Sequence, residues 1–373
     1  MKEKKFYNLD SLNGLRGIAA LIIVLFHYNK LTGTAHSDVN FPFFRILKIG
    51  YTQGGWLVEL FFMISGICFY AFYAKKFLDK KVTIGEFLIK RYIKLWPLYI
   101  ITTIITVICQ FLHKVLHGVY FENNLDLSFR SILLNLLGIA RGWFDNASYP
   151  YNAPAWFLSV LFFVYIIFSV ICSVSAIMDK YKEKVLLILT GICMGLGVII
   201  RAENLQYAVF NVEIGRGLGS FFGGGILYYI LEKTNKSGQK NRLIIWSSLI
   251  FAAGSMTNSV LVNSRFEEIV WIPFVLFPYI IICSVSLNRM AEILECTVFM
   301  KLSRLSYYIY LMQYPIFILF KLVGEHLEWN YYSIFIWLMF WLSLISASFF
   351  VAYIDKKLFQ KFRLSERKIE TKI

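Results

Sequence analysis

Residues 154–177 of the chain are PAWFLSVLFFVYIIFSVICSVSAI, a run without a charged side chain. An α-helix of this length extends about 36 Å, which is more than the ~30 Å hydrocarbon core of a bilayer. The run therefore predicts a transmembrane helix. The whole chain agrees, since 58% of its 373 residues are hydrophobic and only 16% are charged. Soluble domains carry about 25% charged residues, so this composition excludes a soluble enzyme.

Further apolar runs lie on both sides of this one. They predict an all-α polytopic membrane protein, a bundle of about ten transmembrane helices. Residues 1–358 are expected to form one transmembrane domain and residues 359–373 a basic cytoplasmic tail. The first run contains Arg16 and His27 and lacks a small-residue cleavage site, so it predicts a retained helix rather than a signal peptide. The ten runs are Gly14–Lys30, Gly55–Ala74, Leu95–His113, Pro154–Ile177, Lys184–Arg201, Gly215–Leu231, Arg242–Val262, Glu268–Ser286, Lys301–Val323 and Tyr331–Ile354.

The excess of basic residues is explained by membrane topology. The formal net charge of +15 would suggest a nucleic-acid partner for a soluble protein. Most lysines and arginines lie in alternate segments between the apolar runs, as in cytoplasmic loops. We therefore expect cytoplasmic N- and C-termini, contact with membrane lipid head groups and no nucleic acid. Lys114–Ala153 is then the longest outer loop, which either covers a site or is simply tolerated at the surface.

The cysteines do not indicate a covalent or metal-bound framework. They lie in or beside apolar runs and form no Cys-x-x-Cys pair. We interpret them as packing residues, and the sequence gives no other reason to expect a metal ion. The six cysteines are Cys68, Cys109, Cys172, Cys193, Cys283 and Cys296.

Three ionisable residues inside predicted helices need an explanation, because charge is costly within a bilayer. Arg16 and His27 are 11 residues apart, which places them about 20° apart around one helix and ~16 Å apart along it. Glu59 begins the next long helix, which descends from the outer side, and so lies at about the depth of His27. One hypothesis is a polar cleft across the membrane, with His27 as general base and Glu59 as its orienting group. The alternative is that all three lie at helix ends and reach interfacial water.

A basic cluster, defined by Lys90, Arg91 and Lys94, lies in a predicted cytoplasmic segment. Arginine offers phosphate a bidentate fork and lysine a point charge, so the cluster could hold phosphate groups. Trp96 and Pro97 follow directly. The same pattern is typical of a positive-inside anchor with an interfacial tryptophan, and this alternative stays open.

Five motifs, in chain order, resemble the acyltransferase-3 family of integral membrane acyltransferases. Arg16 and His27 match that family's Arg, ten residues, then His, and the other motifs extend across nearly the full chain. Three positions depart from the family pattern: Lys94 stands where Arg is common, Leu161 where an acidic residue is common, and Gln313 where a His often precedes the proline. The motifs are LNGLRGIAA (12–20), ELFFMISG (59–66), KRYIKLWPLY (90–99), PAWFLS (154–159) and SYYIYL (306–311).

The resemblance implies an O-acyltransferase of the stand-alone bacterial O-acetyltransferase type, located in the cytoplasmic membrane. Its donor would be acetyl-CoA, and its acceptor a hydroxyl of a cell-envelope polysaccharide or lipid-linked sugar. Arg16 and the basic cluster would hold the CoA phosphates, while His27 would act as general base and Glu59 would fix its tautomer. Transfer would be direct or pass through an acyl-enzyme. The residues expected on the acceptor side are Trp156, Ser159, Tyr310 and Gln313.

A transporter or flippase for a glycan or small metabolite is the alternative function. Many helices, charged groups inside them and the glycine-rich segment 223–225 suit a transporter equally well. The sequence shows no paired halves with matching broken helices. Consumption of acetyl-CoA by the purified protein would distinguish the two functions.

Overall fold

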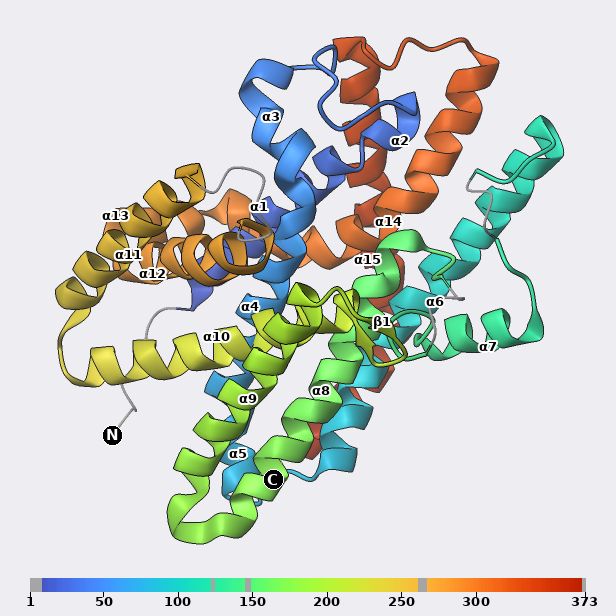
Figure 1. Cartoon of the computed structure of the whole chain (residues 1–373). Helices are drawn as coiled ribbons and strands as arrows, with labels where there is room; N and C mark the ends of the chain where they lie inside the picture. Colours follow the sequence, from blue (N-terminus) through green and yellow to red (C-terminus); the bar gives the residue numbers. More distant parts are fainter. Residues whose placement is uncertain (1–8, 122–124, 145–148, 261–266, 371–373) are drawn as a thin grey trace.

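The computed structural model describes residues 9–121, 125–144, 149–260 and 267–370, which are almost entirely helical (Figure 1). Among them, β-structure is limited to β1 (Gln206–Tyr207) and β2 (Phe210–Asn211), which pair antiparallel. Seven helical stretches in this part of the chain are long and apolar enough to cross a membrane. The predicted class, an all-α polytopic membrane protein, is therefore confirmed.

Helix is present in each range where the sequence predicts it, although the last residues of Arg242–Val262 lie outside the described part. α15 continues past position 358 to Glu370, and the assignment of residues 359–373 to a cytoplasmic tail stays a prediction. The longer helices are α1 (Asp10–Phe26), α3 (Phe44–Gln53), α4 (Leu57–Phe69), α6 (Ile84–His117), α7 (Phe129–Leu137), α8 (Trp156–Ser175), α9 (Lys182–Ala202), α10 (Val212–Lys236), α11 (Lys240–Val260), α12 (Phe277–Ser286), α14 (Thr297–His326) and α15 (Ile334–Glu370). The shorter segments are α2 (Asn29–Thr32), η1 (Gly54–Trp56), η2 (Tyr70–Ala74), α5 (Lys75–Leu78), η3 (Ala153–Ala155), η4 (Ala176–Tyr181), η5 (Glu267–Leu276) and α13 (Asn288–Leu294).

The seven apolar stretches do not match the ten predicted runs one to one. Ala153–Ala202 contains two of the runs, because only the short η4 joins α8 to α9. α10 and α11 are helical but are not among the seven. Glycines and Arg216 lower the hydropathy of α10, and polar residues such as Lys240 and Arg242 lower that of α11. The number of about ten crossings and the cytoplasmic side of both termini remain predictions.

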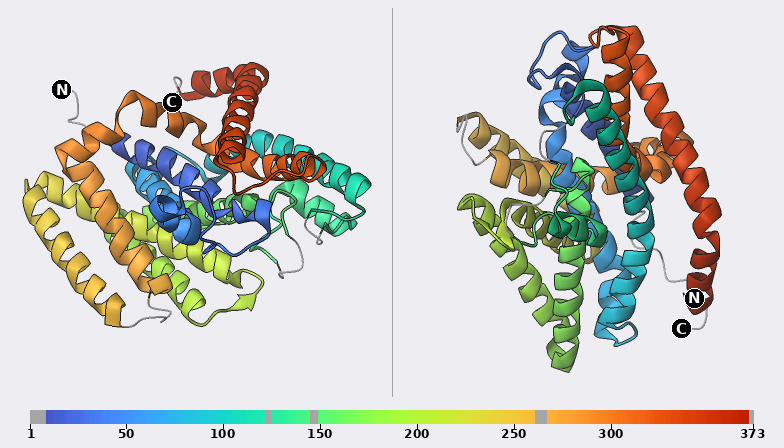
Figure 2. Two further views of the ribbon diagram at one scale, coloured as in Figure 1. Left: turned by 90° about the horizontal axis from the view of Figure 1, so that it is seen from above. Right: turned by 90° about the vertical axis from the view of Figure 1, so that its right-hand side faces the viewer.

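Several long helices, among them α6, α8 and α9, run along the direction between two ends of the molecule, whereas α10 runs across it (Figures 1 and 2). In Figure 1, α5 and the α8–α9 connection lie at the lower end, and α2, α3 and the α14–α15 connection lie at the upper end. α1 packs against α4 and α14, while α10 packs against α4 and α9. His27 directly follows α1 toward the upper end, whereas Arg91 belongs to the first turns of α6 near the lower end. The two groups of predicted site residues thus lie toward opposite ends.

Two glycines bring the backbones of α4 and α10 into direct contact. A Cβ atom added at Gly66 would collide with the carbonyl oxygen of Phe221, and one added at Gly224 would collide with that of Met63. Small residues at helix crossings allow the close packing that is typical of membrane helices. The glycine-rich segment 223–225 therefore serves helix packing, and α10 is not broken there.

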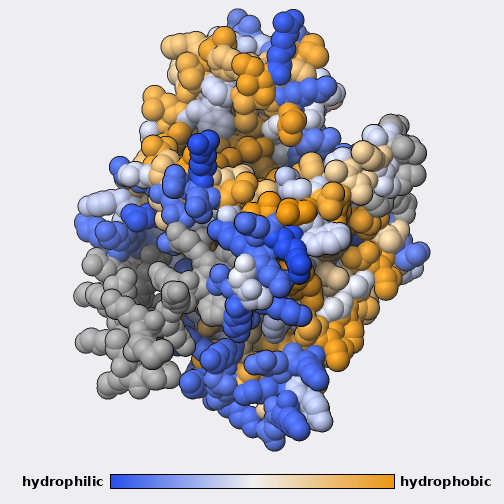
Figure 3. Space-filling view, turned by 90° about the vertical axis from the view of Figure 1, so that its left-hand side faces the viewer, coloured by the Kyte–Doolittle hydropathy of each residue, from blue (hydrophilic) through white to orange (hydrophobic). Residues whose placement is uncertain are grey.

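Large apolar side chains are exposed on the outward faces of several helices. They include Ile104 and Ile108 on α6 and Leu338 and Leu342 on α15. Figure 3 shows one face of the molecule, where hydrophobic side chains dominate the upper part and hydrophilic ones gather lower down. Exposed apolar surface on this scale is expected of a protein in contact with lipid.

Candidate functional site

A cavity of about 630 Å³ lies toward the upper end of the bundle. Its walls come from the end of α1, from α6, from η3 with the start of α8, and from α14. Ligand pockets typically measure about 300–1,000 Å³, so a sugar unit or an acyl group would fit. Nine of its lining residues have polar groups or aromatic rings that can contact a ligand: His27, Lys30, Gln110, Tyr149, Tyr151, Trp156, Gln313, Tyr314 and Phe317.

The long loop that the sequence predicts on the outer side covers this cavity. Leu125, Tyr149 and Tyr151, all within the predicted loop Lys114–Ala153, contribute to its walls. Residues 122–124 and 145–148 of the same loop lie outside the described ranges. Of the two roles that the sequence left open for the loop, the structure supports the covering of a site.

His27 lies on the wall of the cavity, and Gln313 orients its ring. Nδ1 of His27 is 3.0 Å from Oε1 of Gln313. The amide nitrogen of Gln313 donates to the carbonyl oxygen of Tyr310 at 2.8 Å, so the amide oxygen faces the imidazole. Because an amide oxygen only accepts, this network assigns the proton of the neutral ring to Nδ1. The lone pair is then on Nε2, as a general base requires.

Glu59 does not take the orienting position that the sequence analysis gives it. Its carboxylate forms a bidentate pair with Arg216, with Nε–Oε1 and Nη2–Oε2 distances of 2.7 and 2.8 Å. Arg201 approaches the same carboxylate at 3.6 Å. Glu59 is completely buried, so its charge has to be compensated by partners within the protein. In this structure the partner of the His27 ring nitrogen is Gln313, and Glu59 belongs to a separate ion-pair network.

That ion-pair network lies directly behind the cavity wall. The guanidinium carbon of Arg216 is 4.9 Å from the ring centre of Trp156, a cation–π contact, and Trp156 lines the cavity. Glu59 therefore supports Trp156 through Arg216. Tyr310 also lies behind the wall, because its hydroxyl donates to the carbonyl oxygen of Pro154 at 2.7 Å while Pro154 lines the cavity.

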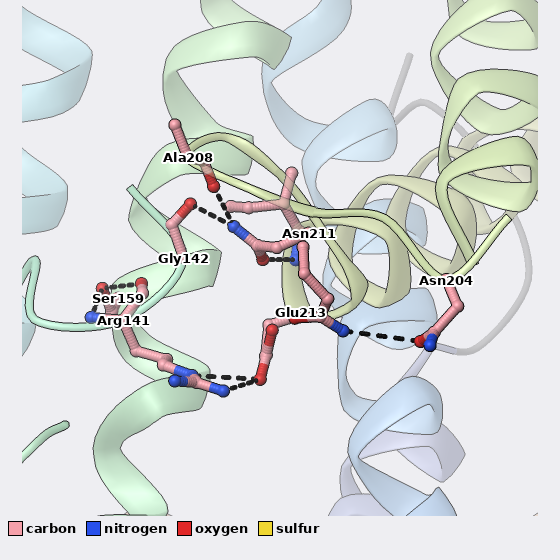
Figure 4. A network of polar contacts seen from close by, with 9 residues as sticks. Arg141, Gly142, Ser159, Asn204, Ala208, Asn211 and Glu213 are labelled. Atoms are coloured by element: carbon pink, nitrogen blue, oxygen red, sulfur yellow. Dashed lines mark hydrogen bonds and ion pairs between the residues drawn. The ribbon is translucent and has the colours of Figure 1, made fainter. Parts of the chain in front are cut away.

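Ser159 belongs to a polar network that anchors the outer loop (Figure 4). Its hydroxyl donates to the carbonyl oxygen of Arg141 at 2.6 Å. The guanidinium group of Arg141 pairs with the carboxylate of Glu213 at 2.6 Å. Asn211 caps the first turn of α10 and donates to the carbonyl oxygen of Gly142 at 2.8 Å. Ser159 is not among the residues that line the cavity, so its contacts hold the loop in place.

At the other end, Arg16 and Arg91 both lie within electrostatic range of the Tyr165 hydroxyl. Arg91 donates to the hydroxyl of Tyr73 at 2.6 Å and lies over the ring of Phe69. The Nε atoms of Arg16 and Arg91 are buried, and neither has a hydrogen-bond partner in the described part of the chain. Buried cationic donors normally find an acceptor, so this pair is suited to an anion.

The cavity does not reach Arg16. Its lining includes His27 but neither Arg16 nor any member of the basic cluster. Phe61, Phe157 and Tyr310, which we call the aromatic layer, pack ring to ring with centroid separations of 5.7 to 6.2 Å. Tyr310 lies one turn of α14 before Gln313, so this layer lies beside the cavity without lining it. Among the described residues, the lining of this cavity therefore does not join His27 to Arg16.

A family model described as "Acyltransferase domain" matches residues 9–354. The chain belongs to the acyltransferase-3 family. No curated protein and no solved structure matches it. The resemblance identified from the five motifs is thereby confirmed, and the alternative of a transporter or flippase gains no support. The matched range contains His27, Gln313 and the basic cluster, which are therefore part of the domain of a membrane acyltransferase.

Sequence reasoning missed mainly the partners of the predicted site residues in this acyltransferase. Glu59 and Arg216 are 157 positions apart, and His27 and Gln313 are 286 apart. An ionisable residue inside an apolar helix indicates that some partner exists, but it does not identify that partner. Gln313 is expected on the acceptor side, and the structure adds that it lines the cavity while bonded to His27.

Proposed function

We propose that this acyltransferase moves an acetyl group from cytoplasmic acetyl-CoA to a hydroxyl of a cell-envelope polysaccharide or lipid-linked sugar. The enzyme would act in the cytoplasmic membrane of a bacterium. The observation that supports this most directly is the position of His27, on a cavity wall with its proton assigned to Nδ1 by Gln313. Such a ring can accept a proton from a hydroxyl at Nε2.

His27 would act as the general base in this reaction. Nε2 takes the proton from the acceptor hydroxyl as the hydroxyl oxygen forms a bond to the thioester carbonyl carbon. The carbon–sulfur bond then breaks, and the protonated His27 returns its proton to the CoA thiolate. Gln313 is a positioning residue in this scheme, because its amide oxygen holds the Nδ1–H of His27 throughout.

The CoA phosphates would bind at the lower end, on Arg16, Lys90, Arg91 and Lys94. The buried, unfilled Nε donors of Arg16 and Arg91 support this assignment. Lys94 is exposed and Lys90 half-buried, so both are accessible to a ligand in the aqueous phase. The acyl arm would then lie along α1 toward His27, and the Tyr310 ring, one turn of α14 before Gln313, would move to admit it.

The acceptor would occupy the cavity beneath the outer loop. Trp156 supplies an aromatic wall of the kind that packs on sugar rings. Tyr310 and Ser159, which the sequence also placed on the acceptor side, would act indirectly by fixing the Pro154 wall and the outer loop. Glu59 would likewise act indirectly, through Arg216 and Trp156.

Substitution of His27 tests this function. Purified protein in lipid nanodiscs is incubated with radiolabelled acetyl-CoA and isolated cell-envelope glycan, and incorporation of acetyl into the glycan is measured. We expect His27→Ala to abolish incorporation, whereas His326→Ala, at the exposed end of α14, should retain it. Arg91→Gln should raise the KM for acetyl-CoA. Full incorporation by His27→Ala would remove His27 from the mechanism, and unchanged donor kinetics in Arg91→Gln would favour the anchor role of the basic cluster.

A further inference from the structure

The upper ends of α6 and α14 bring two histidines and a glutamate together next to the cavity (Figure 1). His113 and His117 lie one turn apart on α6, and Glu325 lies near the end of α14. Each residue offers one potential ligand atom, and these three atoms lie within 4.8 Å of one another. Histidines at positions i and i+4 share one face of a helix and can bind the same ion.

His113 has the orientation of a metal-binding histidine. It is only 5% exposed, and its Nδ1 donates to the carbonyl oxygen of Val119 at 2.8 Å. Because a carbonyl only accepts, the proton is on Nδ1 and the lone pair is on Nε2. Nε2 is buried and has no hydrogen-bond partner within the ranges that the structure describes. Zinc-binding histidines are commonly fixed in the same way, by a hydrogen bond from the second ring nitrogen to a carbonyl group.

The spacing of the three ligand atoms suits a shared ion better than direct hydrogen bonds. Oε2 of Glu325 is 3.9 Å from Nε2 of His113 and 3.5 Å from Nδ1 of His117. Both distances exceed the ~2.7–3.2 Å of a nitrogen–oxygen hydrogen bond. Zinc bonds of about 2.0–2.1 Å in tetrahedral geometry keep the ligand atoms roughly 3.3 Å apart. Glu325 and His117, whose side chains are 35% and 29% exposed, have room to rotate toward Nε2 of His113 until the three separations reach that value.

We propose that His113, His117 and Glu325 bind a Zn²⁺ ion, with water in the fourth position. The ligand atoms would be Nε2 of His113, Nδ1 of His117 and Oε2 of Glu325, the atoms whose distances are given above. Lys321 is the competing cation, with Nζ 3.8 Å from the other carboxylate oxygen of Glu325. This departs from the expectation of no metal ion, because the ligands come from two helices far apart in the sequence. Cysteine spacing, the usual sequence signal, is not involved.

The ion would fasten the rim of the cavity. Gln110 lines the cavity one turn before His113, and its amide oxygen accepts from the backbone N–H of Phe121 at 2.9 Å. The Phe121 ring packs on both His113 and Tyr314, with centroid distances of 5.7 and 6.0 Å. Tyr314 belongs to α14 and lines the same cavity. Zinc would therefore tie α6 to α14 beside the acceptor site and hold this wall in place.

Metal content and thermal stability of the full chain test the proposal. The purified protein is stripped with EDTA, incubated with ZnCl₂ and desalted. Zinc is then quantified by plasma mass spectrometry and the unfolding midpoint by intrinsic fluorescence. We expect about one zinc per chain and a higher midpoint in the zinc-loaded protein, since an ion that binds the native state stabilises it. Co²⁺ in place of Zn²⁺ should give the visible absorption of a tetrahedral site.

Four variants separate this site from adventitious binding. His113→Asn and Glu325→Gln should reduce zinc to background and remove the rise in midpoint. His326→Asn, adjacent to Glu325 in sequence but outside the cluster, should bind zinc normally. Lys321→Gln removes the competing cation and should tighten zinc binding. A wild-type protein without retained zinc, or zinc unaffected by His113→Asn, would overturn the proposal. Neither outcome depends on acyl transfer, so the proposed function is tested separately.

Discussion

Replacement of Gln313 by methionine tests whether the amide oxygen beside His27 contributes to acyl transfer. The change preserves side-chain length but removes the acceptor 3.0 Å from Nδ1 of His27. When His27 takes a proton, the hydrogen bond from Nδ1 becomes charge-assisted and is worth about 1.5–3 kcal/mol. Loss of this stabilisation from the transition state should lower kcat by roughly 10- to 150-fold, since 1.36 kcal/mol corresponds to a factor of ten.

The assay measures release of free CoA from acetyl-CoA by protein in nanodiscs, with cell-envelope glycan as acceptor, and yields kcat and KM separately. Gln110→Met is the matched control, because Gln110 is an amide on the same cavity wall whose oxygen accepts from Phe121. We expect this control to alter the KM for the acceptor and to leave kcat nearly unchanged. Gln313→Glu keeps an acceptor and should recover part of the lost rate. If Gln313→Met has the wild-type kcat, the positioning role of Gln313 is refuted.

Two further predictions concern stability. Glu59→Leu leaves the partly buried Arg216 and the buried Arg201 without the carboxylate that they share, so we expect a loss of about 3–5 kcal/mol and a much lower unfolding midpoint in detergent. An unchanged midpoint would show that the ion pair is dispensable. Gly66→Val should prevent the contact between α4 and α10 and abolish accumulation of folded protein in membranes. Gly191→Ala on α9, where an added Cβ meets no atom within 4 Å, should accumulate normally. Similar amounts of the two glycine variants would contradict the packing argument.

The fold could be predicted because apolar runs specify both the position and the minimum length of a membrane helix. The sequence could not establish whether α10 crosses the bilayer. Gly217, Gly219 and Gly224 on this helix are buried against neighbouring helices. A helix that contacts protein on most of its surface does not need large apolar side chains toward lipid. The mean hydropathy of such a helix therefore does not show whether it crosses the membrane.

The helical period correctly placed His27 on the wall of a cavity, but it did not predict that Arg16 would be excluded from that cavity. A period of 3.6 residues determines which face of α1 a side chain occupies. It says nothing of how the side chains of α4, α8 and α14 pack beside that face, and this packing determines where the cavity ends. The basic cluster was found from the sequence alone, whereas the approach of both Arg91 and Arg16 to Tyr165 required the packed structure.

The contact between α4 and α10 constrains how this acyltransferase can move. The two helices are joined at Glu59 and Arg216 and again, about 10 Å further along α4, where Gly66 meets the backbone of Phe221. Two attachments at separate points along α4 restrict sliding and tilting of the two helices relative to each other. We therefore expect α4 and α10 to move as one rigid unit. In the proposed reaction, room for the thioester to approach His27 would therefore come from a displacement of α14, which carries both Tyr310 and Gln313, relative to this pair of helices.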